Sequence, residues 1–226
     1  MLCKKTLIFL CMEDVLTPGR VSEKVDVREV KKILQNLHAL EGKGTLALVL
    51  LSGSPEEKTK KTLKEHGFAE FFKPENVFAV AKGYLDSKSE ADRLLYEKNI
   101  AKDPQFKDEY FKQHVIMEFI RRGEVPKERM LLLGHDLLTD GFYTLRFSGI
   151  DFALLEDAHS ERHAKKDAKI KGLVYFRRTW GGVRKLISYF PEHDYSGLEK
   201  FIFEELREHL CRDTKLGALA AIGKRG

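Results

Sequence analysis

Continuous apolar runs of strand length are the feature that most constrains the fold of this chain. Three of them cover residues 6–11, 45–51 and 130–134. A strand that is apolar throughout is buried on both faces, whereas a strand with one solvent-facing side alternates polar and apolar residues. Amphipathic segments with helical periodicity separate the runs. Buried strands that alternate with such helices predict an α/β fold with a doubly wound parallel sheet of Rossmann-like type.

Capping signals mark where the helices between these runs begin and end. Asp26 can cap a helix whose apolar residues recur every three and four positions and which ends at Gly42 or Gly44. Pro55, followed by two acids, begins a second helix that runs to about His66. Further strands are expected at about residues 76–80, 149–155 and 172–176, and further helices at about 111–122, 181–188 and 197–210.

The length and the charge distribution set the expected domain organisation. The 226 residues are enough for one substantial α/β domain with a small addition. Residues 83–110 are heavily charged and show little apolar periodicity, so we expect a small, partly helical, cap-like insertion there. We place the main domain at residues 1–211 and a basic, flexible tail at residues 212–226.

Cysteine usage and hydropathy exclude several protein classes. Cys3, Cys11 and Cys211 are widely spaced without a Cys-x-x-Cys pair, which argues against a disulfide framework and against a structural zinc site. The first apolar stretch closes at Glu13 and Asp14 without a cleavage site, so we expect no signal peptide. No apolar run approaches the roughly 20 residues of a membrane helix. These features predict a cytoplasmic protein that binds no membrane.

Residues that can carry chemistry follow each buried run. Cys11 ends the first run and Glu13 comes two residues later, Ser52 and Gly53 follow the second run, and Asp136 follows the third. In open parallel sheets, ligands bind beyond the carboxyl ends of the strands. The sequence therefore predicts a ligand site at this edge of the sheet.

The first of these motifs resembles that of the haloacid dehalogenase-like hydrolases. In that superfamily the first strand ends in Asp-x-Asp, whose first Asp attacks a phosphoryl group and whose second Asp is the general acid and base. Cys11 stands at the first position and Glu13 at the second, so both reacting residues are changed. The resemblance implies a haloacid dehalogenase-like fold of the phosphatase type, Mg²⁺ as the cofactor and a phosphorylated small molecule as the ligand.

Two phosphate-binding motifs fit the same resemblance. Ser52 and Gly53 match the second motif, in which a hydroxyl and backbone N–H groups hold the phosphoryl oxygens. The alternative for Ser52 is a polar turn residue that caps a helix. Lys112, at the start of a predicted helix, matches the lysine that neutralises the nucleophile and the phosphate, with Lys107 as a competitor.

The fourth motif carries the acids that the resemblance assigns to the metal. An apolar strand that ends at Gly134 is followed by Asp136 and, four residues later, by Asp140. Mg²⁺ prefers carboxylate oxygens, and we place it at these two acids because they keep the spacing of the family. His135 is an extra residue before Asp136, which leaves open a register in which His135 takes the metal position.

The changes at the first motif leave the chemistry open. A thiol with an ordinary pKa of about 8.5 is mostly protonated at neutral pH, and its thiolate suits Zn²⁺ better than Mg²⁺. Cys11 can be a small buried residue, an altered or redox-sensitive nucleophile, or part of a different metal site. Glu13 is one methylene longer than Asp, and displacing a catalytic carboxylate by about 1 Å can lower the rate roughly a hundredfold.

Three functions are compatible with the sequence. The first, which we expect, is a phosphatase-type protein that binds a phosphorylated small molecule and in which Cys11 and Glu13 make phosphomonoester hydrolysis weak or absent. The second is a non-catalytic phosphate-binding subunit with a regulatory or assembly role. Because the insertion is small, we expect an open site, or one that a short flap or a partner subunit in a homo-oligomer closes. The third, nucleic-acid binding, rests on basic pieces that are usually solvated faces: Lys165-Lys166, Arg177-Arg178 with Trp180, and Lys224-Arg225.

Overall fold

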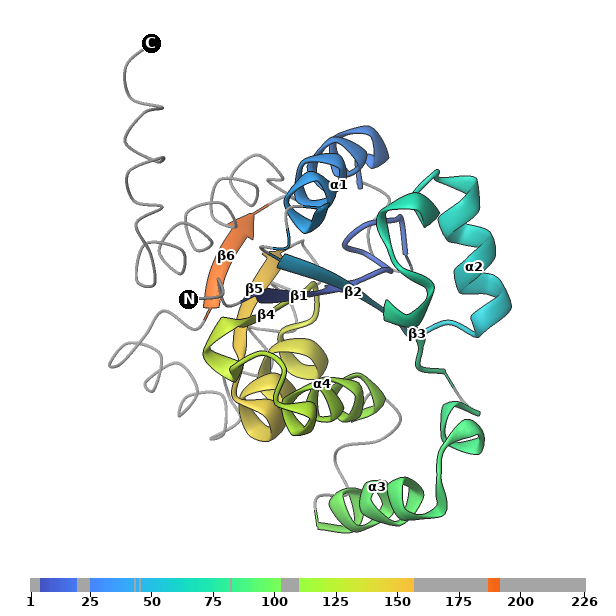
Figure 1. Cartoon of the computed structure of the whole chain (residues 1–226), viewed down its shortest axis with the longest axis vertical. Coiled ribbons are helices and arrows are strands. Elements are labelled where there is room, and N and C mark those ends of the chain that lie inside the picture. The colour runs from blue at the N-terminus through green and yellow to red at the C-terminus, as the bar shows by residue number, and fades with distance from the viewer. Residues whose placement is uncertain are drawn as a thin grey trace.

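Six parallel strands form one sheet in the computed structural model (Figure 1). The structure describes residues 5–19, 25–42, 44, 46–81, 83–102, 110–156 and 187–191. Along the sheet the strands follow the order β3-β2-β1-β4-β5-β6. Their bounds are Thr6–Cys11 (β1), Leu46–Ser52 (β2), Val77–Ala79 (β3), Met130–Gly134 (β4), Asp151–Glu156 (β5) and Ile187–Pro191 (β6).

Helices cover both faces of this sheet. In Figure 1, α1 lies on one side of the strands and α4 on the other, as right-handed crossovers that run in opposite directions along the sheet require. The α-helices are α1 (Val27–Gly42), α2 (Glu56–Glu65), α3 (Glu90–Lys102) and α4 (Tyr110–Arg122). Single tight turns lie at Ala69–Phe71, Pro74–Asn76, Tyr84–Ser87 and Lys127–Arg129, and two wide helical turns at Leu137–Phe142 and Thr144–Ser148. No described helix is both long enough and apolar enough to cross a membrane.

The predicted doubly wound α/β sheet is confirmed. The chain steps outward from β1 through β2 to β3, and then returns to the other side of β1 with β4, β5 and β6. Every residue of β1, β2 and β4 is buried, as their continuous apolar composition predicts. Phe9 of β1 meets the ring of Phe119 of α4 edge-on, with the ring centroids 5.5 Å apart, and so fastens this helix to the sheet. The winding direction changes between β1 and β4, where sheets of this kind open a crevice for ligands.

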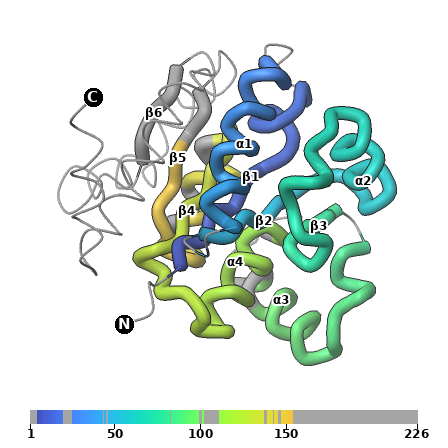
Figure 2. Tube along the Cα trace, turned by 45° about the horizontal axis from the view of Figure 1, so that its top comes forward, coloured from blue at the N-terminus to red at the C-terminus, as the bar shows by residue number. Residues whose placement is uncertain are grey.

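The first strands and helices lie close to their predicted bounds. Asp26 caps α1 as expected, because its Oδ1 accepts hydrogen bonds from the backbone N–H groups of Arg28 and Glu29 at 2.9 and 3.4 Å. The charged insertion is partly helical, with a tight turn and then α3. Figures 1 and 2 show α3 beside α4 and away from the strands. Tyr96 of α3 stacks on Phe111 of α4 at 4.9 Å between ring centroids, which joins the insertion to the rest of the structure.

The predicted helix at about residues 181–188 is wrong at its end. Ile187 and Ser188 belong to β6, which pairs in parallel with β5. The sequence from Ile187 to Phe190 is rich in β-branched and aromatic residues, which favour a strand once a neighbouring strand is available. Residues 181–186, the strand expected at 172–176, the helix expected at 197–210, the tail from 212 and the basic pieces named above lie outside the described residues.

Candidate functional site

The carboxyl edge of the sheet brings the predicted site residues together. Cys11 ends β1, Ser52 ends β2, and Lys112 lies in the first turn of α4. Asp140 lies in the wide helical turn that follows β4. Contacts divide the predicted residues into two groups, one around Lys112 and the other around Glu13. The competitor Lys107 lies outside the described residues.

Lys112 joins the first strand to the fourth. Its Nζ donates a hydrogen bond to Asp140 Oδ1 at 2.8 Å and lies 3.5 Å from Cys11 Sγ. Neither Cys11 nor Asp140 has any exposed surface. A lysine ammonium therefore lies between the thiol and the acid of the fourth motif, and it forms a buried ion pair with that acid.

Burial and this ion pair decide the protonation of the three side chains. Burial raises the pKa of the Cys11 thiol, the negative charge of Asp140 raises it further, and the opposing effect of Lys112 is smaller. Burial is the largest single effect on the other two groups and works against their charged forms, but their mutual attraction outweighs it together with the neighbouring charges and hydrogen bonds. The pKa of Asp140 is therefore lowered and that of Lys112 raised. The site holds a neutral thiol beside a charged pair.

Asp140 is held firmly from several sides. Its Oδ2 accepts hydrogen bonds from the backbone N–H groups of His135 and Asp136 at 3.2 and 3.3 Å. A Cβ at position 134 would lie 2.5 Å from Asp140 Oδ2, so the glycine there permits the close approach. Asp136 supports the turn: its Oδ1 accepts from Thr139 N at 2.7 Å, and its carbonyl accepts from Asp140 N at 3.1 Å. The acid that contacts Lys112 is thus Asp140, with Asp136 bracing the loop around it.

Glu13 binds the two donors that were expected to hold a phosphoryl group. Its Oε1 accepts a hydrogen bond from Ser52 Oγ at 2.6 Å, and its Oε2 accepts from Gly53 N at 3.1 Å. Burial alone would raise the pKa of Glu13, but the hydrogen bond from Ser52 and the charge of Lys112 help to lower it overall. Ser52 Oγ in turn accepts from Ser54 N at 3.1 Å and lies 2.9 Å from Thr59 Oγ1. The carboxylate is therefore ionised, and each of its two oxygens accepts a hydrogen bond.

Asp14 is a buried acid of this edge that the sequence did not single out. Its backbone has a φ of 60°, a conformation that Asp adopts more readily than most residues. Its Oδ2 lies 3.5 Å from Nε2 of His135, so the loops after β1 and β4 meet here. A Cβ at Gly19 would lie 2.2 Å from Asp14 Oδ2, so this turn needs a glycine. The signal in the sequence was the acid directly after Glu13, at a turn that ends in glycine.

Cys11, Lys112 and Asp140, as they lie here, do not fit Mg²⁺. That ion requires a nearly octahedral set of oxygen ligands. The position of the expected first carboxylate holds a neutral, buried thiol, and a lysine ammonium already contacts an oxygen of Asp140. As these side chains lie here, the donor set around Cys11 does not provide the oxygen ligands that Mg²⁺ requires.

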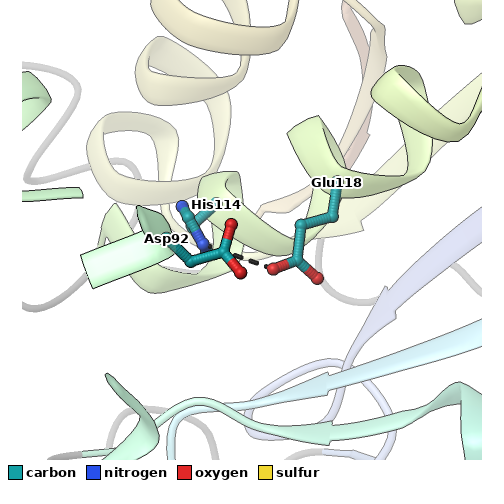
Figure 3. Close-up of side chains that lie close together, drawn as sticks. All are labelled: Asp92, His114 and Glu118. Atoms are coloured by element: carbon teal, nitrogen blue, oxygen red, sulfur yellow. Dashed lines mark ion pairs between the residues drawn. The ribbon is translucent and has the colours of Figure 1, made fainter. Parts of the chain in front are cut away.

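One group among the described residues could hold a metal ion, and it lies outside this edge. Asp92 of α3 and the pair His114 and Glu118 of α4 have ligand atoms within 4.8 Å of one another, as Figure 3 shows. Lys88 Nζ already lies 3.3 Å from Glu118 Oε1, and Arg121 lies 3.6 Å from Asp92. Because cationic side chains already contact both carboxylates, we interpret the group as a polar anchor between the insertion and α4.

Comparisons with known proteins add likenesses of fold. No known protein family and no curated protein matches the sequence. A solved structure of an uncharacterised protein from Listeria monocytogenes serotype 4b is similar at 14% identity, over 89% of this chain and 99% of that chain, with a TM-score of 0.48. The cobalt-bound deoxy-D-mannose-octulosonate 8-phosphate phosphatase from Haemophilus influenzae is similar at 11% identity, over 96% and 97% of the two chains, with a TM-score of 0.43.

A haloacid dehalogenase-like hydrolase protein from Bacillus subtilis is similar at 11% identity, over 70% of this chain and 79% of that chain, with a TM-score of 0.42. At these identities the likenesses concern the fold alone. The strand order itself, with the reversal beside β1, agrees with the resemblance seen in the sequence. The motif residues also lie together at one edge of the sheet. The fold is the doubly wound α/β sheet that the haloacid dehalogenase-like resemblance predicts.

Proposed function

We propose that this is a phosphatase-type haloacid dehalogenase-like protein that binds a phosphorylated small molecule and hydrolyses phosphomonoesters weakly or not at all. The observation that carries this proposal is the state of Cys11. It stands where the resemblance implies an attacking carboxylate, it is fully buried, and its pKa is raised above the ordinary value. A thiol must become a thiolate before it can attack phosphorus.

The neighbours of Cys11 do not activate the thiol. Lys112 Nζ lies 3.5 Å from the thiol, but its raised pKa keeps it an ammonium, which cannot accept the thiol proton. Asp140 is ionised and adds a negative charge that disfavours the thiolate. The carboxylate of Glu13 contacts Ser52 and Gly53. This arrangement supports a site in which the step of nucleophilic attack is lost.

The groups that hold a phosphoryl oxygen in the resembling family are retained. The Ser52 hydroxyl and the Gly53 N–H lie at the end of β2, and Lys112 supplies a positive charge from the other side of β1. Two hydrogen-bond donors and one ammonium suit one phosphate group on a small ligand. The same buried thiol favours the second candidate, a non-catalytic phosphate-binding subunit, and turnover separates the two.

Hydrolysis of a generic aryl phosphate with Mg²⁺ tests this proposal. We expect little or no turnover by the native chain and a gain in turnover for Cys11→Asp combined with Glu13→Asp, because that variant restores both aspartates of the motif. Glu57→Asp, the same chemical change at an exposed position of α2, is the matched control and should leave the rate unchanged. Family-typical turnover by the native chain would refute the loss of hydrolysis. A double variant that neither gains activity nor binds Mg²⁺ would show that the first motif is misplaced.

A further inference from the structure

The hydrogen bonds of Glu13 place an anionic group at the two donors that the resemblance assigns to the phosphate. Two carboxylate oxygens contact two donors, the Ser52 hydroxyl at 2.6 Å and the Gly53 N–H at 3.1 Å. A phosphoryl group would present two of its oxygens to the same donors. We infer that the Glu13 carboxylate is an internal anion that occupies the phosphate site, so that a phosphorylated ligand binds only by displacing it. This inference rests on the proposed function, because it concerns the same site.

The two donors cannot serve both anions at once. Ser52 has one hydroxyl proton, and its oxygen already accepts from Ser54 N at 3.1 Å, so the proton points to Glu13. Gly53 has one N–H, and Glu13 accepts it. An ionised carboxylate offers no proton of its own, so both hydrogen bonds must run from the donors to Glu13. A phosphoryl oxygen therefore gains these bonds only when Glu13 gives them up.

The backbone holds Glu13 beside these donors. Asp14 N donates to Thr17 O at 2.9 Å, Leu16 N donates to Met12 O at 2.9 Å, and Thr17 Oγ1 donates to the same carbonyl at 3.3 Å. Glu13 and Thr17 also form an isolated β-bridge. A group tethered this closely acts at an effective concentration in the millimolar range or above. The turn thus makes Glu13 a strong competitor of a free ligand.

The extra methylene of Glu13 explains how a residue of the first motif reaches the second. Cys11 ends β1, and Glu13 must span from the turn after β1 to Ser52 at the end of β2. The resembling family has Asp at this position, which is shorter by one carbon–carbon bond, about 1.5 Å. We expect the shorter side chain of a Glu13→Asp variant to lose at least one of the two hydrogen bonds. Glutamate at this position therefore blocks the phosphate donors more completely than aspartate would.

Titration calorimetry with inorganic phosphate tests the inference. If the site is open in about a tenth of the molecules or fewer, Glu13→Ala should bind phosphate about tenfold more tightly than the native chain, or tighter still. Glu13→Asp should fall between the two, and Glu57→Ala on the exposed face of α2 should behave as the native chain does. Adding Ser52→Ala to Glu13→Ala should remove the gain, because the vacated donor is then gone.

The chemical shift of the Gly53 amide gives a readout at the site itself. In Glu13→Ala this resonance should move as phosphate is added, at concentrations that leave it in place in the native chain. Equal phosphate affinity for the native chain and for Glu13→Ala would overturn the inference and leave the proposed function standing. Absence of phosphate binding in both would overturn both. Family-typical hydrolysis by the native chain, with the gain at Glu13→Ala present, would overturn only the loss of hydrolysis.

Discussion

Removal of the Lys112 ammonium is the sharpest test of how the site is held together. Lys112→Met retains most of the apolar stem of the side chain and deletes its charge. Asp140, with no exposed surface, would still accept from the two backbone N–H groups of residues 135 and 136, and its Oδ2 would lie 3.8 Å from Nδ1 of His135. Breaking a buried ion pair by removing one partner costs about 3–5 kcal/mol. Because these two hydrogen bonds remain, we expect a loss near the lower value, about 3 kcal/mol.

A double variant separates the ion pair from other effects of the substitution. Lys112→Met with Asp140→Asn removes both charges and leaves no buried charge unpaired. Residues in direct contact couple by about 0.5–3 kcal/mol, so the double variant should lose less stability than the sum of the two single variants. Urea unfolding followed by circular dichroism gives the free energies of unfolding from the midpoint and the slope.

The matched control is the ion pair between Lys60 and Glu56 on the exposed face of α2. This pair also joins a lysine to a carboxylate, at positions i and i+4 of one helix, but both side chains are mostly exposed to solvent. Lys60→Met should leave the unfolding midpoint unchanged within error, because exposed pairs contribute little. If Lys112→Met behaves like Lys60→Met, or if the double variant loses the full sum, the buried pair does not stabilise the site and the reasoning is wrong.

Two further variants test the thiol and the glycine beside Asp140. Burial raises the pKa of the Cys11 thiol in the folded state, and the charge of Asp140 raises it further. The contribution of this thiol to stability is therefore complete below its unfolded-state pKa of about 8.5 and is lost as the pH rises towards its folded-state pKa. Unfolding midpoints measured from about pH 8.5 upward should therefore fall more steeply for the native chain than for Cys11→Ala, and parallel slopes would contradict the raised pKa. Gly134→Ala should cost about 1–3 kcal/mol, because the new Cβ would lie 2.5 Å from Asp140 Oδ2. Gly42→Ala, where a Cβ meets nothing within 4 Å, is the control for urea unfolding, and equal midpoints for the two glycine variants would show that this approach is not tight.

The sequence predicts the central strands well because their signals are local. An apolar run such as residues 130–134 is stable as a strand only where both of its faces are buried, and these residues form the buried strand β4. Because parallel strands end at the same edge of a sheet, the ends of these runs also predict that Cys11 and Ser52 lie at one edge. This prediction needs no information about their contacts. The start of α4 does the same for Lys112.

Features that depend on a distant partner were not predicted. Ile187 and Ser188 form a strand because β5 is available to pair with them, which no local pattern reveals. The wide helical turn that carries Asp140 depends on the hydrogen bonds of one carboxylate with the loop and with Lys112. The contact of Glu13 with Ser52 spans 39 residues of sequence, and only the parallel pairing of β1 with β2 brings the two together.

The buried ion pair of Lys112 and Asp140 determines the net charge of the cluster around Cys11. With a carboxylate at position 11, as in the resembling family, the cluster with Asp140 and Lys112 would hold two negative charges and one positive charge. With Cys11 neutral, the same cluster sums to zero without any added cation. We therefore expect a chelator to leave the stability of the native chain unchanged, whereas Cys11→Asp should depend on a divalent ion to fold well. If the chelator leaves the native chain unchanged, the neutral thiol balances the charges of Lys112 and Asp140 without a divalent ion.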